Sequence, residues 1–212
     1  MNSGWVLAPM GAAVGSVAVP WLTRRALVRL NGTVRISARL RLSAAFAGSV
    51  AGAMAVLASE QTRFRWALPA LLVWAYVLVA AACCDALTQR VPTPLVRQAI
   101  ACTAVLLTVG SIAVGDYRRL AVAGLAAAAA GGVLTLCWRF AGAGFGDVRI
   151  AVLGGLGLLH PKESGLLIAV ATFSLITVSQ ALVALARGGN RNTTIPYGPA
   201  LASAFLVAAA IP

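Results

Sequence analysis

Two aspartates lie where an apolar chain rarely keeps a charged side chain. Asp85 ends the apolar run that begins at Trp66, and Asp147 follows Gly144 and Gly146 at the start of another apolar run. An ionised carboxylate within a bilayer costs roughly 2.5–3.5 kcal/mol on insertion scales, so an acidic residue at this depth indicates a functional site. The chain has only 5 acidic residues among 212, and we expect these two to act together.

Two carboxyl groups a few ångströms apart can hydrolyse a peptide bond. Like charges in a low-dielectric site cannot both ionise, so such a pair shares one proton. The ionised member takes a proton from water, and the protonated member donates one to the substrate carbonyl oxygen. We predict that Asp85 and Asp147 form this pair, and the sequence leaves open which aspartate has which role.

Glycine and proline residues flank both aspartates. The glycines at 142, 144 and 146 allow close approach of another chain, which an extended substrate would use for strand-like pairing. Pro92 and Pro94 end the helix that carries Asp85 soon after the aspartate. Irregular backbone at membrane depth must be satisfied by protein or water, so we expect a water-filled pocket beside Asp85.

Further candidate residues lie near the second aspartate and before the last apolar run. Four residues lie at the start of the last run, where the prolines and the glycine break the chain: Pro196, Tyr197, Gly198 and Pro199. We expect them to line the pocket of the two aspartates, and a plain helix-entry turn is the alternative. Arg149 is expected either to orient a carboxylate or to contact lipid headgroups.

Composition places these residues in a membrane protein. The chain is 60% hydrophobic and 10% charged, with a mean hydropathy of +0.90, far from the values of soluble domains. A membrane span needs about 20 apolar residues. Eight runs are candidates, of which the second is marginal and the sixth is short: 4–22, 43–59, 66–84, 94–114, 120–138, 148–159, 165–186 and 199–211. We predict an all-α, polytopic transmembrane bundle that forms a single domain over residues 1–212.

The net charge of +12 is explained by loops that set membrane topology. No basic cluster is interleaved with aromatic residues as in nucleic-acid-binding domains, so we expect no nucleic-acid partner. Arg24 and Arg25 follow the first run, which points the N-terminus outward. Alternating the runs from there places twelve of the 17 basic residues on the cytoplasmic side. Asp85 and Asp147 fall on that same side, and the other three acidic residues fall on the opposite one.

The remaining polar and glycine patterns are predicted to be structural. Thr23–Leu42 alternates arginine with apolar residues and is expected to lie along the anionic inner leaflet, with a break at Asn31. A solvated basic loop is the alternative. Two G-x-x-x-G pairs, at 11 and 15 and at 48 and 52, favour close helix packing. The four cysteines lack C-x-x-C spacing and His160 is the single histidine, so we predict no metal site and no cofactor.

Three stretches together resemble the prepilin peptidases, the type IV prepilin leader peptidases within the G-x-G-D intramembrane aspartyl proteases. DALTQRVPTPL is similar to the first aspartate and the T-x-x-I-P box, with Pro92 in it. GFGDVRIAVLGGLGL is similar to the G-x-G-D-V-K-L box, with Arg149 where lysine is commoner. IPYGPALASAFLV is similar to the late I-P-F-G-P box, with Tyr197 for phenylalanine. The resemblance extends from about Trp66 to the end of the chain.

The resemblance implies a bacterial cytoplasmic-membrane protease with its active site facing the cytoplasm. It would cleave the short basic leader of type IV pilin, pseudopilin or Flp-type prepilin precursors, with Asp85 and Asp147 in the catalytic positions. Many relatives carry a larger cytoplasmic region with paired cysteines, linked to N-methylation of the cleaved pilin. Here that place is taken by the short, cysteine-free segment 23–42, so neither a zinc site nor methyltransferase activity is expected. Presenilin-like proteases fit less well, because CCD replaces their Tyr-Asp pair and a Pro-Ala-Leu motif is absent.

Two other classes of protein compete with this interpretation. A small proton-coupled transporter also uses embedded carboxylates and broken helices. It predicts an inverted repeat and acidic residues near the midplane, whereas the two halves show no convincing repeat and both aspartates lie toward one face. A catalytically inactive scaffold of a pilus-assembly machine is the third possibility, and the presence of both aspartates argues against it.

Overall fold

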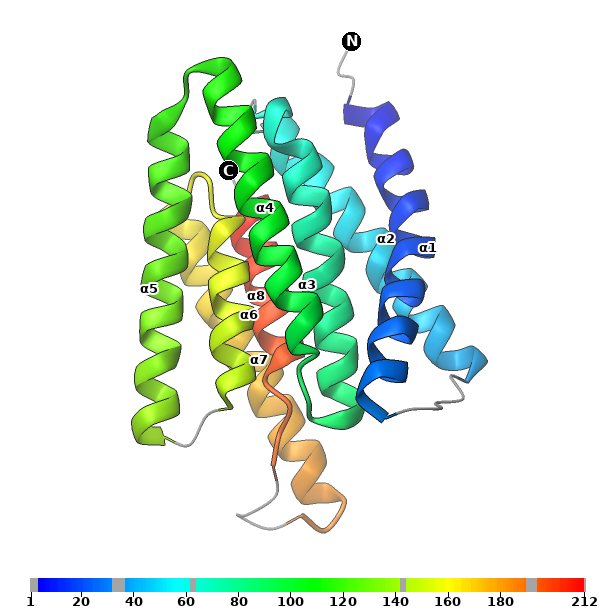
Figure 1. The fold of residues 1–212 in the computed structure, drawn as a ribbon. Helices are drawn as coiled ribbons and strands as arrows, with labels where there is room; N and C mark the ends of the chain where they lie inside the picture. The colour runs from blue at the N-terminus through cyan, green and yellow to red at the C-terminus, as the bar shows by residue number, and fades with distance from the viewer. Residues whose placement is uncertain (1–3, 32–36, 62–63, 142–143, 190–193, 212) are drawn as a thin grey trace.

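The computed structural model describes residues 4–31, 37–61, 64–141, 144–189 and 194–211 (Figure 1). Eight α-helices occupy most of these ranges, and no β-strand occurs within them. In chain order they are α1 Gly4–Asn31, α2 Ala38–Gln61, α3 Leu68–Thr88, α4 Thr93–Val114, α5 Tyr117–Ala141, α6 Phe145–Leu156, α7 Glu163–Ala186 and α8 Gly198–Ala210. A one-turn 3-10 helix, η1 Arg65–Ala67, leads into α3. The predicted all-α bundle is confirmed, with one helix at each of the eight predicted runs.

Five helical segments are long and apolar enough to cross a membrane: Ala38–Glu60, Arg65–Thr88, Thr93–Val114, Tyr117–Phe140 and Glu163–Ala186. The chain is therefore a multi-pass membrane protein. The second predicted run, expected to be marginal, is among these five. Helix α6 has 12 residues and α8 has 13, which corresponds to about 18–20 Å. Since the hydrocarbon core is about 30 Å thick, these two helices are too short to span it alone.

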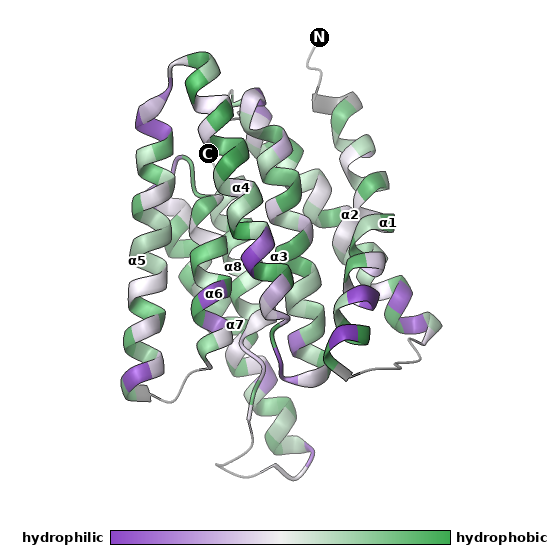
Figure 2. Cartoon of the chain, viewed as in Figure 1, coloured by the Kyte–Doolittle hydropathy of each residue, from purple (hydrophilic) through white to green (hydrophobic). Residues whose placement is uncertain are grey.

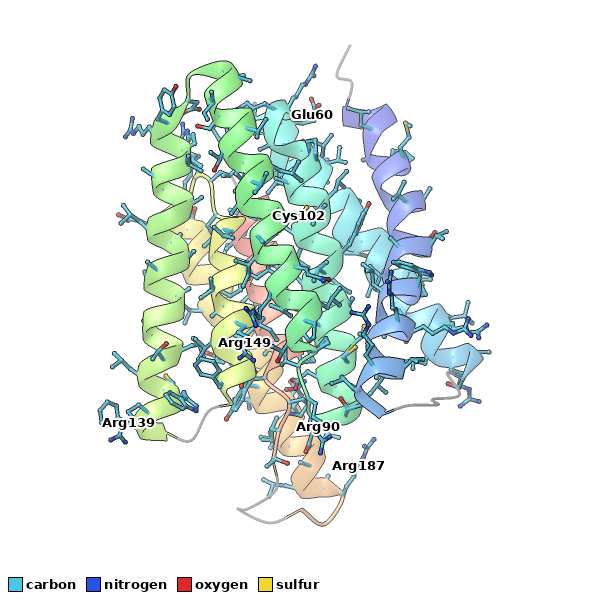
Figure 3. All side chains as sticks on the ribbon, in the orientation of Figure 1. Glu60, Arg90, Cys102, Arg139, Arg149 and Arg187 are labelled. Carbon is cyan, nitrogen blue, oxygen red and sulfur yellow. The ribbon has the colours of Figure 1, made fainter. Side chains whose placement is uncertain are left out.

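The helices run up and down, so that successive connections alternate between two ends of the bundle (Figure 1). Figure 3 shows Arg90, Arg139 and Arg187 at one end and Glu60 at the other. We call the first of these the arginine-rich end. Strongly hydrophilic residues gather there in Figure 2, over the ends of α1, α2 and α5. The alternation of sides agrees with the predicted threading, because α3 ends and α6 begins at the arginine-rich end.

Helix α3 is the centre of the bundle and carries Asp85 in its last turn. It contacts α1, α2, α4, α6 and α8. In its most apolar stretch of 18 residues 72% is buried, whereas the corresponding value for α7 is 6%. Trp74 and Leu78 are fully buried among alanines at positions 75, 80 and 81. Small side chains let several helices pack close around α3, so its end is held by neighbours on most sides.

The two G-x-x-x-G pairs pack against each other between α1 and α2, which confirms their predicted structural role. A Cβ at Gly11 would lie 2.8 Å from the carbonyl oxygen of Gly52, and a Cβ at Gly15 would collide with the backbone of Gly48. The hydroxyl of Tyr76 on α3 donates a 2.7 Å hydrogen bond to the Gly11 carbonyl. Close backbone approach at these glycines therefore attaches the α1–α2 pair to the central helix.

The prediction that Thr23–Leu42 forms a separate interfacial segment is largely wrong. Helix α1 continues through Thr23 to Asn31, and α2 already begins at Ala38. Thr23 and Leu27 are almost completely buried, and Leu27 packs with Ala26 against Cys84 of α3. The residues after the first run keep one apolar face, so the helix extends along the bundle with its arginines outward. The break expected at Asn31 coincides with the end of α1, and residues 32–36 lie outside the described part of the chain.

Candidate active site

Asp85 lies in the last turn of α3 at a backbone break. The helix ends at Thr88, and Gln89 takes a left-handed conformation (φ 52°) with its N–H bonded to the Asp85 carbonyl at 2.8 Å. Pro92, which is buried, is the N-cap of α4. The turn 89–92 therefore separates two helices directly beside the aspartate, where the prolines predicted a break. Asp85 is 5% exposed.

The side chain of Asp85 is held by the start of α8. The Gly198 N–H donates a 2.8 Å hydrogen bond to Asp85 Oδ2. A Cβ at position 198 would lie 2.8 Å from both Cβ and Oδ2 of Asp85, so only glycine allows this approach. A backbone N–H in the first turn of a helix is otherwise unpaired and lies at the positive end of the helix dipole. It therefore suits an acidic partner.

Asp147 occupies the third position of α6, just inside the helix start. Its Oδ2 accepts a 3.2 Å hydrogen bond from the Gly144 N–H, and its own N–H donates to the Gly144 carbonyl at 3.0 Å. This reciprocal bonding fixes the first turn of α6 and the rotamer of the aspartate. Asp147 is 7% exposed. The glycine at 142, part of the same predicted loop, lies outside the described residues.

Both aspartates lie at the arginine-rich end, because α3 ends and α6 begins there (Figure 1). The turn after α3 also contacts the start of α6, because a Cβ on Gly146 would lie 2.6 Å from Val91 Cγ2. In each carboxyl group the hydrogen bonds to described residues use Oδ2. No donor among those residues reaches either Oδ1, so each Oδ1 is available to water or a substrate.

Gln89 and Thr194 join the turn after α3 to the segment before α8. Neither residue is predicted from the sequence. The Gln89 Nε2 donates to the Thr194 carbonyl at 3.0 Å, and the Thr194 hydroxyl donates to Gln89 Oε1 at 2.8 Å. This two-way bond joins the cap of α3 to the segment before α8. No local pattern signals it, because the two residues are 105 positions apart.

Some of the other predicted site residues contact the site of the two aspartates, and others do not. Gly144, Gly146 and Gly198 contact an aspartate or the turn beside it, as described above. Tyr197 points elsewhere: its ring stacks on Phe173 of α7 with centroids 6.4 Å apart and is 38% exposed. Pro196 precedes it and is half-buried.

Arg149 does not contact a carboxylate within the described part of the chain. Its guanidinium donates a 2.7 Å hydrogen bond to the Thr93 hydroxyl and lies 4.7 Å from the centroid of the Phe145 ring. The first of its two predicted roles, orienting an aspartate, is therefore not seen. Instead, Arg149 joins the second turn of α6 to the first turn of α4, across the turn that follows Asp85.

An apolar groove of about 470 Å³ lies between α2, α3 and α8, and neither aspartate is among its lining residues. Two of the residues that line it, Ala86 and Pro199, directly follow Asp85 and Gly198 in the sequence. Its walls are lined mainly by small and aliphatic side chains, including Ala47, Val50, Met54, Val79, Ala82, Ala202, Ser203 and Leu206. A groove of this composition suits an apolar segment.

Within the described residues, no group of three or more His, Cys, Asp or Glu side chains is placed to hold a metal ion. The four cysteines are free. Comparisons of the chain with protein-family models, with curated proteins and with solved structures find no match.

Proposed function

We propose that this protein is an intramembrane aspartyl endopeptidase with Asp85 and Asp147 as its catalytic pair. The observation that carries the proposal is their convergence. Two of the few acidic residues of the chain lie 62 positions apart and are both buried at the same end of the bundle. The helix starts and turns that carry them are in contact, because Gly146 packs on Val91 of the turn after α3. Burying two carboxylates together is costly unless they share a proton. That shared-proton arrangement is what peptide hydrolysis by a carboxyl pair requires.

The fixed hydrogen bonds suggest how the pair would work. The N–H groups of Gly198 and Gly144 hold the Oδ2 atoms, so the two Oδ1 atoms would be the ones that act on the water and the peptide. The ionised carboxyl group would take a proton from the water as it attacks the carbonyl carbon. The protonated group would donate its proton to the carbonyl oxygen. The carboxyl group that took the water proton would then pass it to the amide nitrogen while the other carboxyl group takes a proton back from a hydroxyl of the tetrahedral intermediate, so that the C–N bond breaks and the amine leaves.

The three motifs that resemble prepilin peptidases supply the proposed substrate. It is a pilin, pseudopilin or Flp-type precursor, whose short basic leader is followed by an apolar helix. The apolar helix would lie in the groove between α2, α3 and α8, and the leader junction would lie toward Asp85, which directly precedes the groove residue Ala86. By the positive-inside rule the arginine-rich end would face the cytoplasm, and the resemblance to prepilin peptidases implies that the cell is bacterial. Neither a metal nor methyltransferase activity is part of the proposal.

The experiment is to compare Asp85→Asn and Asp147→Asn with the wild type in membranes that also contain a prepilin-like precursor. Each variant should lose cleavage by about 10²–10⁴-fold, the usual contribution of a general acid or base. Asp116→Asn is the matched control, because Asp116 lies between α4 and α5 and contacts Arg119. Cleavage by both site variants at the wild-type rate, with equal expression, would refute the assignment.

A proton-coupled transporter is the second candidate, favoured by one observation. Helices α6 and α8 are too short to span a membrane, and their starting turns meet the two aspartates. Half-length helices that converge on a polar site are also typical of transporters. Purified protein in liposomes separates the two candidates. Proton flux that both Asp→Asn substitutions abolish, without any precursor cleavage by the wild type, would favour transport.

A further inference from the structure

A second cleft lies between α1 and α4 at the arginine-rich end. It has a volume of about 230 Å³ and is separate from the apolar groove between α2, α3 and α8. Its polar lining comes from Arg25, Arg29 and Gln98, and its apolar lining from Trp21, Leu22, Ala26, Leu30, Pro92, Pro94 and Leu95. The cleft is thus amphipathic, with charged groups and aliphatic walls in one cavity.

The positive charge of this cleft has no counter-ion among the described residues. Arg25 and Arg29 are one helical turn apart on α1 and both line the cleft. The described ion pairs are Arg65–Glu60 and Arg119–Asp116, and neither involves these arginines. The Arg25 guanidinium instead lies 5.2 Å from the centroid of the Trp21 ring. Two adjacent guanidinium groups without an acidic partner favour an anion with several oxygen atoms.

The position of the cleft points to a lipid as the source of that anion. Trp21 is 56% exposed, and an exposed tryptophan next to arginines is typical of a helix at the membrane interface. Leu22, Leu30 and Leu95 supply the kind of surface against which an acyl chain packs. Basic pockets between transmembrane helices on the cytoplasmic side bind phosphate-bearing headgroups.

We infer that the α1–α4 cleft binds the phosphate headgroup of an anionic phospholipid, with Arg25 and Arg29 on the phosphate oxygens. Gln98 offers an additional donor, and the leucines contact the upper part of the acyl chains. The cleft adjoins the turn between α3 and α4, because Pro92 lines it. The inference does not depend on the proposed protease activity.

The test is a binding measurement on the purified full-length protein in detergent micelles by native mass spectrometry. The probes are phosphatidylglycerol, phosphatidylcholine and inorganic phosphate. Each basic residue near an anionic surface contributes about fivefold to binding, so Arg25→Gln/Arg29→Gln should weaken phosphatidylglycerol binding by roughly thirtyfold. Arg25→Lys/Arg29→Lys keeps both charges and should lose less. Arg24→Gln/Arg139→Gln removes the same charge outside the cleft and should bind within about twofold of the wild type.

Several results would overturn the inference. Unchanged binding by Arg25→Gln/Arg29→Gln would do so, as would an equal loss in Arg24→Gln/Arg139→Gln. Equal affinity of the wild type for phosphatidylcholine would remove the preference for an anionic headgroup. Displacement of the lipid by inorganic phosphate at an equal concentration would assign the cleft to free phosphate rather than a lipid. Melting temperatures of all variants show whether a loss of binding reflects unfolding, in which case the Lys variant decides.

Discussion

Substitution of Gly198 by alanine is the sharpest test of how the site is built. The new Cβ would lie 2.8 Å from the Cβ of Asp85, whereas ordinary van der Waals contact begins at 3.4 Å. The start of α8 and the end of α3 must therefore separate by about 0.6 Å. Rotation of the carboxylate does not relieve the contact, because the Cβ of Asp85 is fixed to the backbone of the central helix.

The magnitude of the effect follows from opposing contributions. Overpacking costs about 1–3 kcal/mol, and stretching the bond from the Gly198 N–H to the carboxylate removes part of another 1.5–3 kcal/mol. Alanine in a helical turn returns up to about 1 kcal/mol relative to glycine. We expect a net loss of about 1–3 kcal/mol in the free energy of unfolding. If the protein is a protease, a displacement approaching 1 Å at Asp85 should also lower kcat by up to about 100-fold.

Two assays check this prediction. Thermal unfolding in detergent reports stability without reference to function, and precursor cleavage in membranes reports the position of the aspartate. Gly132→Ala is the matched control, because a Cβ at this helical position of α5 meets nothing within 4 Å. Gly198→Ala with the stability of Gly132→Ala and the wild-type cleavage rate would show that the contact with Asp85 is not formed.

Three further predictions concern the surroundings of the site. Gly146→Ala places a Cβ 2.6 Å from Val91 and should destabilise the protein. Adding Val91→Ala should restore part of the lost stability, with a coupling of about 0.5–3 kcal/mol between the two substitutions. Melting shifts that simply add would contradict this contact. Ser203→Trp fills the groove and should slow cleavage of a membrane-anchored precursor at least tenfold while sparing a short soluble peptide, whereas Ser179→Trp on exposed α7 should affect neither. Burial, and then nearby Arg and Lys charges, hold the pKa of His160 below 6.5. The contribution of His160 to stability should therefore be constant above pH 6.5 and fall slightly as the pH drops below it, and His160→Asn should remove this contribution.

Much of the fold could be predicted because membrane insertion depends on local composition. Each of the eight apolar runs became a helix, since the backbone of an apolar segment in lipid must bond to itself. The main difference lies at Thr23, where the apolar run ends but the helix does not. The helix continues because Thr23 and Leu27 share a buried face while the arginines between and after them remain exposed.

Part of the site could also be predicted. Asp85 and Asp147 were identified because a charge in an apolar segment is costly, and that cost can be estimated from the sequence. Arg149 shows the limit of such reasoning: nothing local indicates that its guanidinium reaches Thr93, which is 56 positions earlier.

Hydropathy and charge are properties of short segments, so they are enough to predict an α-helical membrane protein with two acidic residues at helix ends. The contacts that join Gly198 to Asp85 across 113 positions, and Val91 to Gly146, arise only in the folded bundle. Those contacts depend on which helices pack around α3 and how closely. Side-chain volumes from many distant segments, acting together, set that packing.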